Sequence, residues 1–536
     1  MSTRRARAAG VAAAALALLS GATTTGLGVA LAQSGEFPPD AAEPPLTAVP
    51  RAACGAGSDP EPGMQGRVAA GDADALDGSR CNVEVVGRFG DSGGYKVERY
   101  VDSAGRECAY YDTTLLYPTN ATSVLEQEPS GVAVLDMSDP SNPTLSRTLN
   151  TPAMETPHES LLVNQRRGLL AAVAGNPLFQ AGQVDIYDLT EDCRNPQLRS
   201  SRPVGVLGHE AGFSPDGNTF WASSLGGGTL TAIDVSDPSN PVPVYVGNHD
   251  THSVTISQDG TRAYLAAGAG FPRNEIGSPA EVNGLEILDV SQVQQRAATP
   301  EVSRVGAVEW ASVTIPQAAI PVTIGGKPYV VEMDEFAYDG TRIAGNGERV
   351  GAARIIDISD ETAPRVVSNI RLEVHDPAVR PSLEGDPGAA SATGGYAGHY
   401  CAVPRREEPG ILACSFLASG LRVFDIRDPL APREVAYFVA PVDGQQANAA
   451  FASAAFAPER SEVWYSDGSR GFFALRLTNG AWPQAQPAPA PAGPPGAAPQ
   501  PERRQLAATG LALPVSGALT VLLAALAVRV TRRRTG

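Results

Sequence analysis

GVAVLDMSDPSNP, residues 131–143, is the stretch of this sequence that decides the fold. An apolar run ends at Asp136, and a Ser-Asp-Pro turn follows at once. The run is apolar at every position, as in a strand covered on both faces, and its β-branched residues favour strand over helix. The two following Pro residues and their Asp and Asn neighbours favour turns, so we expect the chain to reverse there.

The same pattern returns five more times along the chain. Each copy has an aspartate where the apolar run stops, and successive aspartates are 46 to 68 residues apart. We call these residues the anchor aspartates and expect them to accept hydrogen bonds in turns. A period of this length is typical of a repeat architecture. The anchors are Asp136, Asp188, Asp234, Asp289, Asp357 and Asp425.

Each repeat predicts four strands. After the turn a new strand begins, as in PVPVYVG at residues 241–247. Before the anchor strand, two further strands flank a tight turn, as at Asp216-Gly217 and Asp259-Gly260. Units of four short strands that recur in this way are typical of the blades of a β-propeller.

The number of blades follows from the ends of the repeat region. The six anchors indicate six blades, and GFFALRL at residues 471–477 resembles a seventh anchor strand with Arg476 in place of the aspartate. NVEVVGRF at residues 82–89 resembles an outer strand, so we expect it to pair with 471–477 and close the ring without exposed edges. We therefore predict an all-β, seven-bladed β-propeller over residues 81–478. Eight blades are the alternative, if residues 304–357 contain an extra one.

The string V-x-[VIL]-x-D-[VI]-S-D-P-x-x-P resembles the LVIVD repeat, and copies of it extend over residues 82–478. The LVIVD family consists of secreted and surface β-propeller proteins. The resemblance therefore implies a propeller that works outside the cell. It implies no particular activity, because the family has no single agreed one.

The N-terminal region is expected to lie outside the propeller. A basic start at residues 4–7, an apolar core at 9–22 and a small-residue cleavage site at 30–32 are typical of a signal peptide, which we assign to residues 1–32. Residues 33–80 are rich in Pro, Ala, Gly and Asp, and we expect them to form a disordered linker.

The C-terminal region combines a spacer and a tail. Residues 479–505 are rich in Pro and Ala and predict a disordered wall spacer. Residues 506–536 contain the pentapeptide LAATG, an apolar stretch at 511–528 that predicts a transmembrane helix, and a terminal arginine cluster. The pentapeptide comprises Leu506, Ala507, Ala508, Thr509 and Gly510.

This tail resembles a sortase cell-wall sorting signal in the L-A-x-T-G form found among Gram-positive actinobacteria. The resemblance implies that a sortase cuts between Thr509 and Gly510 and joins Thr509 to the cell wall. The protein would then be extracellular, with the sortase as processing partner and with membrane contact only through the C-terminal helix. The alternative is a tail that remains a single-pass membrane anchor.

Six cysteines in an exported chain permit disulfides. Cys401 and Cys414 lie symmetrically about a hairpin turn, so they are expected to face each other and pair. The other four allow three connectivities, of which we favour Cys54 with Cys81 and Cys108 with Cys193. Buried free thiols are the alternative.

Four of the six histidines stand at corresponding places, just before or within the strand that is expected to be innermost in its blade. Innermost strands line the central channel of a propeller, so these imidazoles are expected to converge there. Glu159 and Glu210 follow two of them directly, and residues 332–335 are expected nearby. Imidazole and carboxylate together suit a divalent ion such as zinc or copper. The four histidines are His158, His209, His252 and His399.

A structural role for these histidines is nevertheless the favoured interpretation, because repeats inherit the same residue at the same place. The sequence has no Walker, G-x-S-x-G, H-E-x-x-H or dinucleotide-binding motif. Its net charge of −17 argues against binding nucleic acid. We therefore expect a wall-displayed module that binds a protein, glycan or small molecule through the long loops at 268–284 and 333–351. A metal-binding protein or metal-dependent extracellular enzyme is the alternative.

Overall fold

The structure is a computed structural model, and it describes residues 43–68, 77–113, 131–175, 181–225, 227–268, 282–338, 347–391, 394–441 and 449–483. All of them belong to the first of two compact units, Met1–Ala492 and Gly493–Gly536. The predicted signal peptide, sorting signal and C-terminal helix lie outside the described residues, as do residues 269–281 and 339–346 of the two long loops. No helix within the described ranges is long and apolar enough to cross a membrane.

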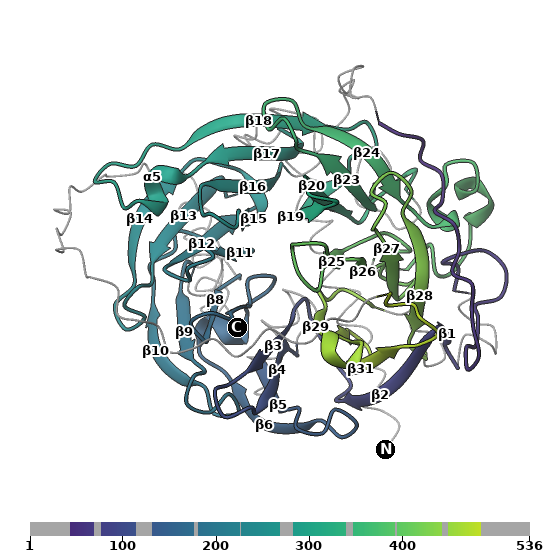
Figure 1. Cartoon of the computed structure of the whole chain (residues 1–536), viewed down its shortest axis with the longest axis horizontal. Helices are drawn as coiled ribbons and strands as arrows, with labels where there is room; N and C mark the ends of the chain where they lie inside the picture. Colours follow the sequence, from purple (N-terminus) through teal and green to yellow (C-terminus); the bar gives the residue numbers. More distant parts are fainter. Residues whose placement is uncertain are drawn as a thin grey trace, which may run out of the picture. The chain divides into compact units, whose positions relative to one another are not determined.

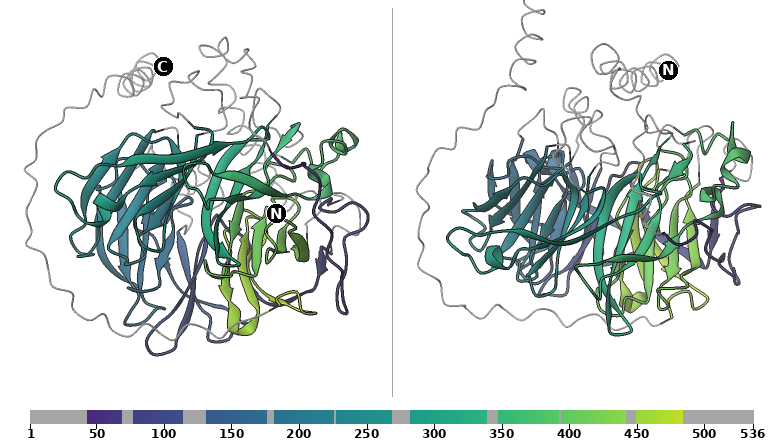
Figure 2. Two further views of the ribbon diagram at one scale, coloured as in Figure 1. Left: turned by 45° about the horizontal axis from the view of Figure 1, so that its top comes forward. Right: turned by 90° about the horizontal axis from the view of Figure 1, so that it is seen from above.

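Seven antiparallel sheets follow one another around a central axis, which confirms the prediction of an all-β, seven-bladed propeller (Figure 1). The oblique and perpendicular views show the strands of each sheet running roughly along that axis (Figure 2). Blades 1 to 7 are numbered by their innermost strands. These are β3 (Val97–Val101), β7 (Leu162–Asn164), β11 (Ala211–Phe213), β15 (Thr251–Ile256), β19 (Ile315–Ile324), β25 (Tyr400–Ala402) and β29 (Ala455–Ala457).

The second and third strands form the middle of each blade and are almost entirely buried. The second strands are β4 (Glu107–Asp112), β8 (Leu169–Val173), β12 (Thr219–Ser224), β16 (Arg262–Ala267), β20 (Lys327–Glu335), β26 (Ile411–Ser415) and β30 (Glu462–Asp467). The third strands are β5 (Val132–Asp136), β9 (Val184–Asp188), β13 (Thr229–Asp234), β17 (Gly284–Asp289), β23 (Ala353–Asp357), β27 (Leu421–Asp425) and β31 (Gly471–Leu477).

The outer strands complete the blades. They are β6 (Thr144–Leu149), β10 (Gln197–Arg202), β14 (Val242–Gly247), β18 (Ser303–Glu309), β24 (Arg365–Ile370), β28 (Arg433–Val439) and β2 (Val83–Phe89). Short helical turns occur between strands at α4 (Pro152–Glu155), α5 (Ser291–Gln294), η1 (Glu373–His375), η2 (Arg380–Leu383) and η3 (Pro458–Arg460).

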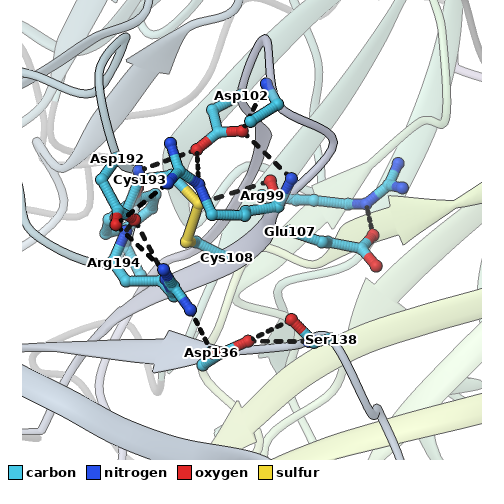
Figure 3. Close-up of a disulfide and its surroundings, with 12 residues drawn as sticks. Arg99, Asp102, Glu107, Cys108, Asp136, Ser138, Asp192, Cys193 and Arg194 are labelled. Carbon is cyan, nitrogen blue, oxygen red and sulfur yellow. Dashed lines mark hydrogen bonds and ion pairs between the residues drawn. A yellow bond between two sulfur atoms is a disulfide. The ribbon is translucent and has the colours of Figure 1, made fainter.

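The anchor aspartates end the third strands of blades 1 to 6. In blade 1, Oδ1 of Asp136 accepts hydrogen bonds from the backbone N–H of Ser138 at 2.9 Å and from its hydroxyl at 2.6 Å (Figure 3). The other five anchors accept a bond from the backbone N–H two residues on in the same way. These side chains therefore set the turn that starts each outer strand.

The ring closes through the N-terminal strand, as predicted. Strand β2 pairs antiparallel with β31, so the seventh blade takes its outer strand from the other end of the repeat region. In all seven blades the register between the third and outer strands shifts once, and β2 on β31 shows the same shift. Strand β2 thus occupies the position of a genuine outer strand.

The described residues between 304 and 357, which leave out only 339–346, form no additional blade. The length of this stretch is taken up by the long strands β19 and β20 and by a small hairpin of β21 (Ala337–Tyr338) and β22 (Arg349–Val350). The eight-bladed alternative is therefore excluded.

Outer strands also contact the turn of the following blade. The hydroxyl of Ser200 in β10 donates to the carbonyl oxygen of Pro238 at 2.7 Å, and Ser368 in β24 donates to that of Pro429 at 2.7 Å. The equivalent position in β18 is Gly306, where a Cβ atom would lie 2.0 Å from the carbonyl oxygen of Glu361. This position therefore brings blade 2 into contact with blade 3, blade 4 with blade 5, and blade 5 with blade 6.

The expectation of a disordered linker over residues 33–80 does not hold for residues 43–68. This segment, which we call the strap, runs along the outside of blades 5 and 6 (Figure 1). The backbone N–H of Val49 donates to the carbonyl oxygen of Arg371 at 2.9 Å, and that of Glu434 donates to Pro50 at 3.0 Å. Strand β1 (Ser79–Cys81) then adds a fifth strand to blade 6 beside β28.

The structure contains all three disulfides in the pairing favoured from the sequence. Cys401 and Cys414 lie directly opposite each other in β25 and β26. The Cys54–Cys81 bond ties the strap to β1, and the Cys108–Cys193 bond joins blade 1 to the turn of blade 2 (Figure 3). The alternative of buried free thiols is excluded.

Candidate metal centre

The four histidines that stand at corresponding positions in the repeats lie together at the propeller axis. His158 and Glu159 immediately precede blade 2, and Glu159 forms a parallel backbone bridge with Glu210, which follows His209 at the entry to blade 3. His252 is the extra residue of a β-bulge in β15, and bulges commonly re-aim a side chain. His399 precedes β25.

Three ligand atoms form a compact triangle. Nε2 of His209 lies 3.0 Å from Nε2 of His252 and 3.1 Å from Oε2 of Glu159. Nε2 of His252 lies 3.3 Å from the same carboxylate oxygen. Nε2 of His158 faces that oxygen from 3.9 Å. Three nitrogen atoms of neighbouring imidazoles are therefore directed at one oxygen.

Glu335, the last residue of β20, adds a second carboxylate. Its Oε1 lies 3.2 Å from Nε2 of His252, and its Oε2 lies 3.2 Å from Nε2 of His399. Glu159 is placed in the same way, because its other oxygen, Oε1, lies 3.3 Å from Nε2 of His399. Both carboxylates thus contact both imidazoles. We call Glu159, Glu335 and the four histidines the axial cluster.

The cluster is buried on one side and reached by solvent on the other. The side chains of His252 and His399 are 1% exposed and that of Glu159 is 2% exposed. The side chains of His158 and His209 are 16% and 19% exposed. The solvent-facing side of the cluster is therefore formed by these two imidazoles.

The surroundings fix the orientation of the ligand groups. Nε2 of Gln317, at a β-bulge in β19, donates to Oε1 of Glu159 at 3.0 Å. Nζ of Lys96 donates to Glu210 at 2.9 Å, and a Glu210 oxygen lies 3.5 Å from Nδ1 of His252. Such outer contacts orient ligands and tune their basicity.

Burial and the neighbouring charges strongly shift the pKa values of three histidines and of Glu159 in the cluster. Burial disfavours the charged form of His252, but the adjacent carboxylates outweigh it and raise its pKa to about 10. The pKa of His399 is raised to about 9 in the same way. Burial alone would raise the pKa of Glu159, but the imidazoles of His252 and His158 hold it well below its usual range. Burial lowers the pKa of His158 to about 3.

Two atoms of the cluster, Oε2 of Glu159 and Nδ1 of His252, lack a hydrogen-bond partner of normal geometry. Oε2 of Glu159 is completely buried and accepts no hydrogen bond among the described residues, although three imidazole nitrogens surround it. Buried carboxylate oxygens are normally satisfied, so such an exception points to a bound cation or water. The donor types, nitrogen from imidazole and oxygen from carboxylate, are those of zinc and copper sites.

Several residues that the sequence placed near the axis lie elsewhere. Glu332 and Asp334 form ion pairs with the buried Arg354 instead of joining the cluster. Glu210 contacts His252 only through Nδ1, on the side of the ring away from the triangle. Sequence reasoning missed Lys96 and Gln317, whose only signal is their position at the innermost strands of two of the three blades that lack a histidine there.

A second group of possible ligands, Asp102, Asp192 and Cys193, does not make a metal site. The sulfur of Cys193 is bonded to Cys108 (Figure 3). Asp102 accepts a hydrogen bond from Arg106 at 2.6 Å, and Asp192 is paired with Arg106 and Arg194. These carboxylates are neutralised by arginines.

Comparison with known proteins identifies the repeat. A family model described as the LVIVD repeat matches residues 129–151 and 225–251, which contain the third and outer strands of blades 1 and 3. No curated protein matches the chain.

Three solved structures with a similar course of the chain share little sequence identity with it. The Cps50 (Swd1) β-propeller domain of Myceliophteria thermophila has a TM-score of 0.44 at 11% identity, covering 73% of this chain and 98% of that one. Hydrazine synthase of Kuenenia stuttgartiensis has a TM-score of 0.44 at 12% identity, covering 73% and 97%. A functionally unknown protein from Desulfotomaculum acetoxidans has a TM-score of 0.38 at 13% identity, covering 65% and 90%.

Proposed function

We propose that this β-propeller is a metal-binding protein that holds a divalent transition-metal ion at its axis. The observation that carries the proposal is the triangle formed by Oε2 of Glu159, Nε2 of His209 and Nε2 of His252, with sides of 3.0 to 3.3 Å. Ligand atoms about 2.0–2.1 Å from zinc are about 3.3 Å apart in a tetrahedral site and about 2.9 Å apart in an octahedral one. The triangle already has the spacing of a coordination shell.

The exposure pattern supports a site that accepts an outside ligand. The inner ligands are shielded, whereas His158 and His209 form the solvent-facing side. Structural zinc sites are closed by four protein ligands, whereas catalytic sites keep one position open. An ion held here would act as a Lewis acid toward a small molecule that arrives along His158 and His209.

Elemental analysis of the purified propeller tests this proposal. We expect stoichiometric zinc or copper in the parent and its loss in a His209→Ala, His252→Ala double variant. Added ion should raise the melting temperature of the parent, and a chelator should reverse the gain, because the ion binds only the folded chain. His249→Ala is the matched control, since His249 lies three residues from His252 but contacts Glu286 and Tyr245 instead. A parent that binds no metal and shows no shift contradicts the proposal.

We also propose that the protein is exported and displayed on the cell wall as an interaction module. The sequence of the tail supports this location, and the three disulfides are in keeping with an oxidising compartment outside the cytoplasm. The LVIVD repeats and the propeller fold suit an interaction module, whose partner would be a protein, glycan or small molecule.

Cell fractionation tests the anchoring. We expect wild-type protein to remain on peptidoglycan after boiling in detergent, and Thr509→Ala protein to be released. Thr520→Ala, within the apolar stretch, is the control and should remain attached. Wild-type protein that detergent extracts completely would show that the tail is only a membrane anchor.

A further inference from the structure

We propose that the axial cluster binds two metal ions, bridged by the carboxylates of Glu159 and Glu335. This inference rests on the proposed metal-binding function and extends it to a dinuclear centre. The first ion lies in the triangle of Glu159, His209 and His252. The second lies beside His399.

The two carboxylates have the arrangement of bridging ligands. Each directs one oxygen to Nε2 of His252 and the other to Nε2 of His399, at distances of 3.2 to 3.3 Å in all four cases. Both oxygens of each carboxylate therefore lie against an imidazole nitrogen, as the oxygens of a bridging carboxylate do. The near-equality of the four distances gives two equivalent positions for a cation, one at each imidazole.

The contacts of the His399 ring suit a cation at Nε2. Nδ1 of His399 lies 2.9 Å from the backbone carbonyl oxygen of Phe451, and a carbonyl only accepts, so Nδ1 carries a hydrogen. In the neutral ring Nε2 then bears a lone pair, which would face two carboxylate oxygens. That arrangement is repulsive unless a proton or a metal ion lies between Nε2 and the oxygens.

The same Nδ1 contact prepares His399 as a metal ligand. Metal-binding histidines commonly donate their other ring N–H to a backbone carbonyl or carboxylate, which fixes the ring and raises the basicity of the ligand atom. Stacking against Tyr95 and an edge contact with Phe451 hold the ring further. The His399 ring is therefore preorganised to direct Nε2 at the bridging oxygens.

The charges of the cluster set the character of a centre with two ions. The cluster brings two carboxylates and four imidazoles into a largely dehydrated region, and Lys96 is engaged with Glu210 outside it. One divalent ion balances the two ionised carboxylates while every imidazole is neutral. Two ions give a net positive centre that attracts a hydroxide or an oxyanion from the exposed side, and in two-metal sites the ions are about 3.5–4 Å apart.

Metal stoichiometry tests the inference. The apoprotein is titrated with copper(II) and measured by elemental analysis and native mass spectrometry. We expect two ions per chain in the parent, one in His399→Ala, and two in His249→Ala. The ion that remains in His399→Ala should have an affinity within about tenfold of that of the first ion in the parent. The reason is that Glu159, His209 and His252 are unchanged in this variant.

Electron paramagnetic resonance gives a readout that needs no variant. Two copper(II) ions at such a spacing should couple, giving a reduced or half-field signal in the parent, and His399→Ala should show an isolated copper(II) signal. One ion in the parent with an uncoupled signal overturns the dinuclear centre and leaves the proposed metal function standing. No ion in the parent overturns both.

Discussion

Nη2 of Arg422 donates to the carboxylate of Glu61 at 2.6 Å, across 361 residues of sequence. The guanidinium is completely buried in blade 6 and also contacts Glu434 at 3.1 Å and the face of the Tyr437 ring. The strap therefore supplies one of the two counter-charges of a buried arginine. It is part of the folded propeller and not an appendage.

Replacing Glu61 should accordingly destabilise the propeller. A buried pair that loses one partner typically costs about 3–5 kcal/mol, and Glu61→Gln should fall near 3 kcal/mol because Glu434 remains. Chemical denaturation of the parent and variant, both with disulfides intact, measures the change. Glu84→Gln is the control, because Glu84 pairs with Arg476 at 3.4 Å on an exposed surface and should cost under about 1 kcal/mol. Equal effects would mean that the buried Glu61–Arg422 pair stabilises the propeller no more than an exposed ion pair does.

The folded structure of the strap could not be predicted from the sequence. The blades were predictable because their third strands are continuous apolar runs that end in a turn aspartate. Residues 43–68 have few large apolar side chains, and they attach through backbone hydrogen bonds and charged pairs with residues more than 300 positions away. A local pattern contains no signal for such pairs, so the segment resembles a linker.

The contact between Gly306 and the next blade gives a second prediction. Gly306 is buried with ordinary strand φ, so Gly306→Ala would normally stabilise the strand. Here the new Cβ would lie 2.0 Å from the carbonyl oxygen of Glu361, and we expect a loss of about 1–3 kcal/mol instead. Ser303→Ala, at an exposed position of the same strand, should change stability by less than about 0.5 kcal/mol. Thermal and urea unfolding measure the stability changes of the two variants. A Gly306→Ala variant more stable than the parent would refute the close packing of blades 4 and 5.

His375 predicts a pH dependence of stability. Its Nδ1 accepts the backbone N–H of Leu372 at 3.1 Å, and Nε2 lies 2.7 Å from the carbonyl oxygen of Tyr396, so the ring must be neutral with the hydrogen on Nε2. Burial, aided by nearby arginines, holds its pKa well below the usual range. Below about pH 6.5 the unfolded chain therefore binds one more proton than the folded chain, and stability is lost as the pH falls.

The His375 contribution amounts to at most about 1.4 kcal/mol per pH unit. It is absent above about pH 7 and grows from pH 6.5 toward pH 5. We expect the free energy of unfolding of the metal-free parent to fall more steeply over this range than that of His375→Asn, whatever the absolute stability of the variant. If the free energy of unfolding of the parent and that of His375→Asn change equally with pH, His375 is not held neutral in the folded protein.

The candidate site was only partly accessible from the sequence. The four histidines could be found because they recur at the same place in different repeats. Glu335 stands at the end of a second strand, and Gln317 points to the axis only because a bulge in β19 shifts the register there. Glu335 belongs to the stretch 332–335 that the sequence placed near the axis. Bulges depend on the pairing of whole strands, so no local pattern indicates that Gln317 contacts the cluster.

His158 combines a ligand position with an unusual backbone. Its φ of 49° lies in the left-handed region, which is unfavourable for a residue with a Cβ atom. Its ring contacts those of Tyr95 and His209, with centroids 4.7 and 4.5 Å away, and thereby stays on the open side of the cluster. Strained backbone of this kind persists where function requires a side chain at that place.

A comparison of His158→Ala and His158→Gly separates the backbone from the ring. Both variants remove the imidazole, so both should bind the first metal ion at least about tenfold more weakly than the parent. Only glycine adopts the left-handed conformation freely, so in the metal-free state we expect His158→Gly to be about 1 kcal/mol more stable than His158→Ala. Calorimetric titration and denaturant unfolding supply the two measurements. If metal affinity is unchanged in both variants while the stability difference appears, the strain is real but His158 is not a ligand, and the solvent-facing side of the site depends on His209 alone.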